Sequence, residues 1–337
     1  MLSPYTKVTM ITQKTTFPDF IWYQVHDMTP EERSWLTTDQ LIPNELLSYA
    51  VDPYESARME YDEDADLTLI IFDVVTPTST RATTEPIGML FSNDQKRLFT
   101  FTRPETDYVD NYLSGTEVSR RPLPDHATPL DVILNGAELL SSKFMSAILE
   151  INRRRTPIQS EIRKTKQTQK TIDQLMDLQT DLIYLLNSLH TDRDLLRSYK
   201  ARKTVQLTDH QAERIDDVTV ELQQAIDTGE LSQLVTNSVS DAFVNLANSN
   251  LNWTMKLLTV SSIVLTVPNI VSGFFGQNVS LPFTHTPMGW IITIILTLIL
   301  MSITTVILWR SGFFRKYPIT PKGTFRRRCL FCVLTTH

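Results

Sequence analysis

Leu257–Phe275 (LLTVSSIVLTVPNIVSGFF) is a run of nineteen residues without a charged side chain, and Gly289–Trp309 (GWIITIILTLILMSITTVILW) is a second run of twenty-one. An α-helix of about 20 apolar residues crosses the hydrocarbon core of a bilayer. Two helices buried in a soluble core are the alternative, but the rest of the chain has no apolar surface large enough to cover both runs. We therefore predict transmembrane helices over 257–275 and 289–309, joined by a loop over 276–288.

The charges around these runs predict how the chain is oriented. The loop 276–288 contains no Lys or Arg, whereas Arg310, Arg315 and Lys316 open a basic tail over 310–337. Lys and Arg concentrate on the cytosolic side of membrane helices. The N-terminal MLSPYTKVTM lacks the apolar core of a cleaved signal peptide. We expect a multi-pass protein of the cytoplasmic membrane, with both termini in the cytosol and the loop outside.

Charge divides the chain into an acidic body and a basic end. All 38 Asp and Glu residues lie at or before Asp241, and eight of the 32 Lys and Arg residues lie after it. Residues 1–241 thus hold 24 basic against 38 acidic residues, a net charge of −14, and the remainder carries +8. This acidic body opposes nucleic-acid binding by Arg153-Arg154-Arg155, which we interpret as a helix-surface cluster. The lipid bilayer, not a nucleic acid, is the expected partner.

Common enzyme signatures are missing. The nine glycines form no dinucleotide- or phosphate-binding loop, and the six histidines form no H-E-x-x-H. Cys329 and Cys332 form a C-x-x-C near the C-terminus, without the second pair that a structural zinc site needs. We expect no catalytic site and no enzyme activity.

Residues 1–128 have the pattern of a small cytosolic α/β domain. Runs rich in β-branched and aromatic residues predict strands, namely Phe20–His26, Leu67–Val75, Ile87–Phe91 and Arg97–Phe101. TPEERSWL (29–36) and IPNELLSYA (42–50) begin with helix-start residues and continue with spaced apolar positions. We expect short helices packed on a sheet.

Helical periodicity takes over at Pro129. Residues 129–208 predict long amphipathic helices, and from Asp209 no proline occurs before Pro268. One helix over Asp209–Phe275 would be about 100 Å long, so a funnel or stalk helix over 209–256 would lead into the first membrane helix. The predicted fold class is an α+β cytosolic domain followed by long helices and two C-terminal transmembrane helices.

The first membrane helix has one polar or small face. At steps of three and four residues this face carries Asn252, Met255, Thr259, Ser262, Thr266, Asn269 and Gly273. In a membrane such a face either packs against another helix or lines water. The second reading requires several copies, because a subunit with two spans cannot enclose a pore. Neutral oxygen atoms suit a magnesium ion that keeps its hydration shell.

The polar residues of the second run are arranged differently. Thr293, Thr297, Ser302, Thr304 and Thr305 form no single narrow line. That helix therefore suits an outer, lipid-facing ring.

The region around the loop resembles the CorA family of magnesium transporters. Gly276-Gln277-Asn278 directly follows the first run and resembles the Gly-Met-Asn signature of that family. Asn252 and the segment MKLLT (255–259) follow the order and spacing of the family. The resemblance is specific over 209–316 and only architectural over 1–200. Gln277 stands where the signature has methionine, and changes there are associated with branches that move zinc or other dications.

The resemblance implies a homopentamer with the first membrane helix around the pore. It implies a selectivity entrance at Gly276, Gln277 and Asn278, an amide ring at Asn252 and a hydrophobic gate at Met255 and Leu258, with Thr259, Ser262, Thr266, Asn269 and Gly273 lining the pore. It also implies gating by intracellular Mg²⁺ through acids at subunit interfaces, for which Glu45 and Asp217 are our candidates. Mg²⁺ is the expected cargo and regulatory ion.

Two other functions stay open. The protein could belong to a branch of the same family that transports Zn²⁺, Co²⁺ or Ni²⁺. A membrane-anchored adaptor could instead use the long helices as a coiled-coil stalk, but it would need neither the polar face nor Gly276-Gln277-Asn278 at the outer turn.

Overall fold

The computed structural model describes residues 13–77, 81–114, 123–163, 169–202, 207–277 and 288–311. The chain forms two compact units, Met1–Phe243 and Val244–His337. Asn278, most of the expected external loop, and the tail with Cys329 and Cys332 lie outside the described residues.

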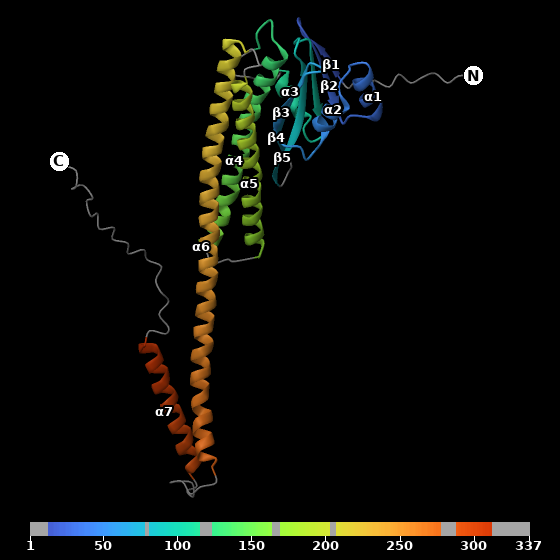
Figure 1. The fold of residues 1–337 in the computed structure, drawn as a ribbon. Helices are drawn as coiled ribbons and strands as arrows, with labels where there is room; N and C mark the ends of the chain where they lie inside the picture. Colours follow the sequence, from blue (N-terminus) through green and yellow to red (C-terminus); the bar gives the residue numbers. More distant parts are fainter. Residues whose placement is uncertain are drawn as a thin grey trace, which may run out of the picture. The chain divides into compact units, whose positions relative to one another are not determined.

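A six-stranded sheet forms the centre of the first unit (Figure 1). Its strands are β1 (Gln13–Thr16), β2 (Ile21–His26), β3 (Arg58–Asp62), β4 (Leu67–Pro77), β5 (Ala82–Ser92) and β6 (Arg97–Thr102), in the order β1-β2-β6-β5-β4-β3. Neighbouring strands are antiparallel except for β2 and β6, which are parallel. The four predicted strands are confirmed. The prediction missed β1 and β3, the two short edge strands: β1 (QKTT) is wholly polar, and β3 (RMEYD) is only five residues long, with three charged side chains.

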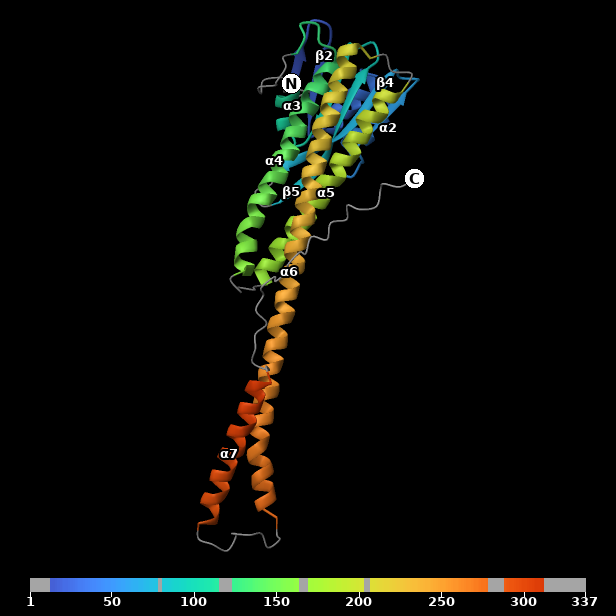
Figure 2. The ribbon, with the colours of Figure 1, turned by 90° about the vertical axis from the view of Figure 1, so that its left-hand side faces the viewer.

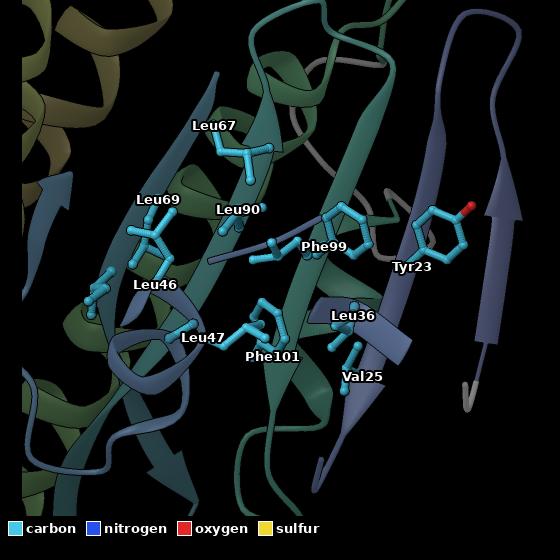
Figure 3. Close-up of a cluster of buried hydrophobic side chains, with 13 residues drawn as sticks. Tyr23, Val25, Leu36, Leu46, Leu47, Leu67, Leu69, Leu90, Phe99 and Phe101 are labelled. Carbon is cyan, nitrogen blue, oxygen red and sulfur yellow. The ribbon is translucent and has the colours of Figure 1, made fainter. Parts of the chain in front are cut away.

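Helices cover both faces of this sheet. On one face α1 (Pro30–Thr38) and α2 (Asn44–Val51) confirm the two predicted short helices. They bury Leu36, Leu46 and Leu47 against strand residues that include Leu69, Leu90, Phe99 and Phe101 (Figure 3). Full burial of one such side chain contributes roughly 1.5–3 kcal/mol, so this cluster is a main source of the unit's stability.

The opposite face carries the long helices. α3 (Tyr108–Leu113) is short, whereas α4 (Pro129–Arg163) and α5 (Gln169–Ala201) confirm the long helices predicted for 129–208. Ile70 and Phe72 of β4 lie here against Leu134 of α4 and Leu196 of α5. Because side chains alternate along a strand, β4 contributes to both layers of the core.

α6 (Asp209–Phe275) is one continuous helix of 67 residues, as predicted, and α7 (Gly289–Arg310) follows the loop. Among the described residues, three helices, α4, α6 and α7, are long and apolar enough to cross a membrane. Their most apolar windows are 61%, 11% and 0% buried, respectively. Burial identifies α4 as a core helix and leaves α6 and α7 as the two apolar helices exposed in a single chain.

Candidate pore-lining site

The part of α6 in the second unit has two different faces. Val260 and Val271 are buried, and Val264 and Val267 between them are half-buried. Figures 1 and 2 both show α7 beside this part of α6. The predicted polar stripe faces elsewhere, since Asn252, Met255, Leu258, Thr259, Ser262, Thr266, Asn269 and Gly273 are all exposed. Within one chain the stripe is therefore not a seam with α7.

The hydroxyl groups of the stripe are oriented by their own helix. Thr259 Oγ1 donates to Met255 O at 2.9 Å, Ser262 Oγ to Leu258 O at 2.9 Å, and Thr266 Oγ1 to Ser262 O at 2.8 Å. Each hydroxyl proton is thereby used, and the oxygen lone pairs are left to accept hydrogen bonds from outside the helix. The stripe is thus a row of neutral acceptors, which suits donors such as the protons of metal-bound water.

Large apolar side chains interrupt the polar stripe near its N-terminal end. Leu251, Met255 and Leu258 are 61%, 58% and 69% exposed. They lie on the α6 surface just before and after Asn252. Exposed apolar groups of this size on a helix are stabilised by packing against another surface.

Glycine and a tight turn end the helix. The Gly276 N–H donates to Ser272 O at 2.8 Å, and the Gln277 N–H donates to Phe274 O at 3.4 Å. A Cβ atom added at Gly273 would meet no atom within 4 Å, so contacts within the chain do not require glycine there. A small residue on this exposed face would allow other helices or an ion to approach the backbone closely.

The stripe also extends upstream, which the sequence reasoning missed. Asn245 and Asn248 are exposed and precede Asn252 at steps of three and four residues. Asp241, also exposed, lies four residues before Asn245. The repeated asparagines in NLANSNLNW (245–253) are the sequence signal for this extension.

The structure does not bring the two regulatory candidates together. Glu45 is an exposed residue of α2, where its Oε1 accepts from Tyr49 Oη at 2.8 Å. Asp217 is a half-buried residue of α6. The part of α6 in the first unit runs beside α4 and α5, on the other side of the sheet from α2 (Figure 1). Within the described part of the chain, no group of three or more His, Cys, Asp or Glu side chains could hold a metal ion. An ion bridging Glu45 and Asp217 would have to join two copies.

The arrangement of α7 agrees with its sequence pattern. Thr293, Thr297 and Thr304 are half-buried, whereas Ser302 and Thr305 are exposed, so the polar residues are split between two faces. Thr297 Oγ1 and Thr305 Oγ1 donate to backbone carbonyls four residues earlier, at 2.7 and 2.8 Å. These hydroxyl protons are paired within α7 itself.

Comparisons with known proteins identify the family. The family model described as "CorA-like Mg2+ transporter protein" matches residues 18–310. The "Cobalt/magnesium transport protein CorA" of Methanocaldococcus jannaschii is 28% identical over 144 residues, which are 42% of this chain and 45% of that protein, so this match spans less than half of the relative's length.

Two solved structures share the fold. The complete structure of the CorA magnesium transporter from M. jannaschii has a TM-score of 0.77 at 22% identity, covering 88% of this chain and 92% of that chain. The full-length CmaX protein has a TM-score of 0.66 at 17% identity, with coverages of 88% and 90%. With the family model matching nearly the whole described chain, the protein belongs to the CorA-like Mg²⁺ transporter family.

Proposed function

We propose that the protein is a divalent-cation channel of the cytoplasmic membrane, in which several copies surround a pore lined by the polar stripe of α6. The observation that carries this proposal is the row of neutral acceptors on the exposed face of a membrane helix. Thr259, Ser262 and Thr266 each direct the hydroxyl proton into the helix and the lone pairs outward. A hydrated dication presents water protons to such a row.

The chemistry of the stripe favours an ion that keeps its first hydration shell. Residues 252–277 contain no Asp or Glu that could replace metal-bound water. Mg²⁺ loses its water reluctantly, and hydrogen bonds of about 1 kcal/mol each would hold the hydrated ion weakly enough to release it. We propose Mg²⁺ as the main cargo, with Co²⁺ also carried, since the named relative is a cobalt/magnesium transport protein. The alternative is a preference for Ni²⁺ or Zn²⁺, because Gln277 stands where the family signature has methionine.

The proposed assembly is a homopentamer with both termini in the cytosol. Exposed Leu251, Met255 and Leu258 support packing between copies of α6. In this assembly Asn252 forms the amide ring at the cytosolic mouth, and Met255 with Leu258 forms the hydrophobic gate. Native mass spectrometry in mild detergent should give five copies, and a monomer or dimer would contradict the pore.

Ion flux into proteoliposomes tests the function. Vesicles containing the purified protein and a dication-sensitive dye should take up Mg²⁺ and Co²⁺, and parallel assays with Ni²⁺ and Zn²⁺ rank the cargo. Thr266→Val keeps the side-chain shape but removes the acceptor, so flux should fall by about tenfold if one hydrogen bond to the ion is lost and by more than about a thousandfold if all five are lost at about 1 kcal/mol each. Thr305→Val makes the same change on an exposed position of α7 and is the matched control. No flux in the wild type would favour the adaptor hypothesis, and equal loss in both variants would remove the polar stripe of α6 from the mechanism.

The proposed outer entrance is tested separately. Asn278→Ala should abolish most of the flux without changing the oligomer, because it removes one acceptor from every subunit. Gln277→Met should retain flux and shift the ranking toward Mg²⁺. Wild-type flux in correctly inserted Asn278→Ala protein would remove Asn278 from the mechanism.

The proposed gating concerns the first unit, Met1–Phe243, which we call the head. We propose that intracellular Mg²⁺ bridges neighbouring heads through acids such as Glu45 and Asp217 and stabilises a closed state. Chelation should then increase protease cleavage of the wild type, and Glu45→Gln with Asp217→Asn should be cleaved equally with and without Mg²⁺. A double variant that still responds to Mg²⁺ would assign the bridge to other acids.

A further inference from the structure

A surface cavity lies where the two parallel strands of the sheet end. Its volume is about 380 Å³, and it opens at the C-terminal ends of β2 and β6, the parallel pair among the described strands. Val25, Ala50 and Phe101 contribute apolar surface to it, and all of its lining residues belong to the described part of the chain. Ligands of α/β proteins commonly bind at the carboxyl ends of strands.

Two arginines line this cavity, and each is already held in place. Arg33 Nε and Nη2 donate to Asn44 Oδ1 at 2.9 and 2.6 Å, and Nη2 also donates to Ser48 Oγ at 2.7 Å. Arg103 Nη2 donates to Pro86 O at 3.0 Å, and its Nε lies 3.4 Å from Glu85 Oε2. Both guanidinium groups are therefore oriented before any ligand arrives, which lowers the entropic cost of binding.

Each arginine also keeps donor capacity. Neither Arg33 Nη1 nor Arg103 Nη1 makes a hydrogen bond to a described residue. The described hydrogen-bond partners of Arg33 are all neutral. A guanidinium with free donors binds carboxylate and phosphate groups well. Residues 1–241 carry a net charge of −14, so a cavity lined by two arginines is a local exception.

The remaining polar groups of the cavity narrow the ligand class. At the start of α1 the Thr29 and Glu32 N–H groups are already paired in a capping box, with Glu32 Oε2 accepting from the Thr29 N–H at 2.9 Å and Thr29 Oγ1 accepting from the Glu32 N–H at 3.3 Å, and Pro30 has no N–H. The backbone at this helix end is thus not the anion site. Asp27 also lines the cavity and opposes a highly charged polyanion. Glu85 also pairs with Arg103, so two arginines stand against two carboxylates, which favours a ligand with a single negative charge.

We propose that this cavity binds a small organic anion whose carboxylate or phosphate group pairs with Arg33 and Arg103, while its apolar body covers Val25, Ala50 and Phe101. The volume lies within the roughly 300–1,000 Å³ of small-molecule sites. This site is separate from the ion pathway and does not depend on the proposed transport function.

Fluorine NMR on the full-length protein in detergent tests the proposal. The probe 4-(trifluoromethyl)benzoate should show saturable binding, whereas its neutral amide, 4-(trifluoromethyl)benzamide, should not; the amide also controls for partition into micelles. Phenyl phosphate should displace the benzoate, which compares phosphate with carboxylate. Arg33→Gln and Arg103→Gln should each weaken binding by about tenfold or more. Arg153→Gln, an exposed arginine paired with Glu150 on α4, is the matched control and should bind normally.

A cavity-filling variant covers the case in which an arginine variant loosens the head. Val51→Phe keeps both arginines and fills part of the cavity, so it should abolish binding without lowering the melting temperature. Equal binding of benzoate and benzamide to the wild type would overturn the proposal. Wild-type affinity in both arginine variants, or in Val51→Phe, would overturn it as well.

Discussion

A buried carboxyl group in the head lacks a counter-charge, and this makes a sharp prediction. Asp192 of α5 is fully enclosed, and its Oδ1 accepts the Asp73 N–H at 2.9 Å. Its Oδ2 has no hydrogen-bond partner, and no basic side chain of the described residues pairs with it. Burial raises the pKa of Asp192 well above its usual value, and the neighbouring Asp73 charge raises it further. Burial likewise raises the pKa of Asp73.

Because the pKa of Asp192 is raised in the folded protein, the sign of the pH dependence of stability follows. Asp192 keeps its proton in the folded head at pH values where the unfolded chain, with a pKa of about 3.9, has lost it. The stability that this proton contributes is complete below the unfolded pKa and is lost as pH rises through the folded pKa. The loss is about 1.4 kcal/mol per pH unit for one proton. Asp192→Asn removes this proton and keeps an oxygen acceptor for Asp73.

The assay compares Asp192→Asn with the wild type by thermal unfolding between pH 4.5 and 7.5. For a unit of this size the melting temperature of the variant should rise relative to the wild type by roughly 3–6 °C per pH unit until the folded pKa is reached. Titrating groups that do not interact with Asp192 cancel in this difference. One of them is Asp110, whose pKa is raised to about 6, mainly by burial, in both proteins.

Asp181 provides the matched control for Asp192. It is equally enclosed, but Arg81 Nε lies 3.3 Å and Arg154 Nη1 3.7 Å from its carboxylate, and the Ala82 N–H donates to it at 3.1 Å. Asp181→Asn should destabilise the head by about 1–3 kcal/mol, less than for a fully buried pair because both arginines are partly exposed. A flat difference between Asp192→Asn and wild type across the pH range would refute the reasoning.

Three further changes give distinct outcomes. Gly88→Ala should lower the melting temperature strongly, by about 3 kcal/mol of stability, because its Cβ would lie 2.5 Å from the Ala50 backbone oxygen; an unchanged melting temperature would contradict this packing. Gly273→Ala should leave the melting temperature unchanged, since the Cβ meets nothing within 4 Å, yet reduce Mg²⁺ flux through the proposed pore. Equal Mg²⁺ flux in Gly273→Ala and in the wild type would place Gly273 away from the narrow part of the proposed pore. Asn248→Ala should reduce Mg²⁺ flux more than Asn250→Ala, because Asn250 lies off the stripe. Equal effects of the two variants would contradict the proposal that the pore extends upstream of Asn252.

Local sequence patterns were sufficient for the long elements. The charge-free runs and the absence of proline before Pro268 predicted α6 and α7, because hydropathy and helix continuity depend on neighbouring residues. The same holds for the central strands β4, β5 and β6, whose apolar and aromatic runs are long. The polar stripe was also visible from spacing alone, since a helix presents every third or fourth residue on one face.

Tertiary structure decided what depends on residues far apart in the chain. Asp192 meets Asp73 across a separation of 119 residues, and no local pattern shows that this carboxyl group is enclosed without a cation. The lining of one cavity includes both Arg33 and Arg103, which are 70 positions apart in the sequence. The short edge strands β1 and β3 form because stronger neighbours supply their hydrogen-bond partners. Periodicity reports which face of an element is apolar, but only packing determines which distant side chains share a site.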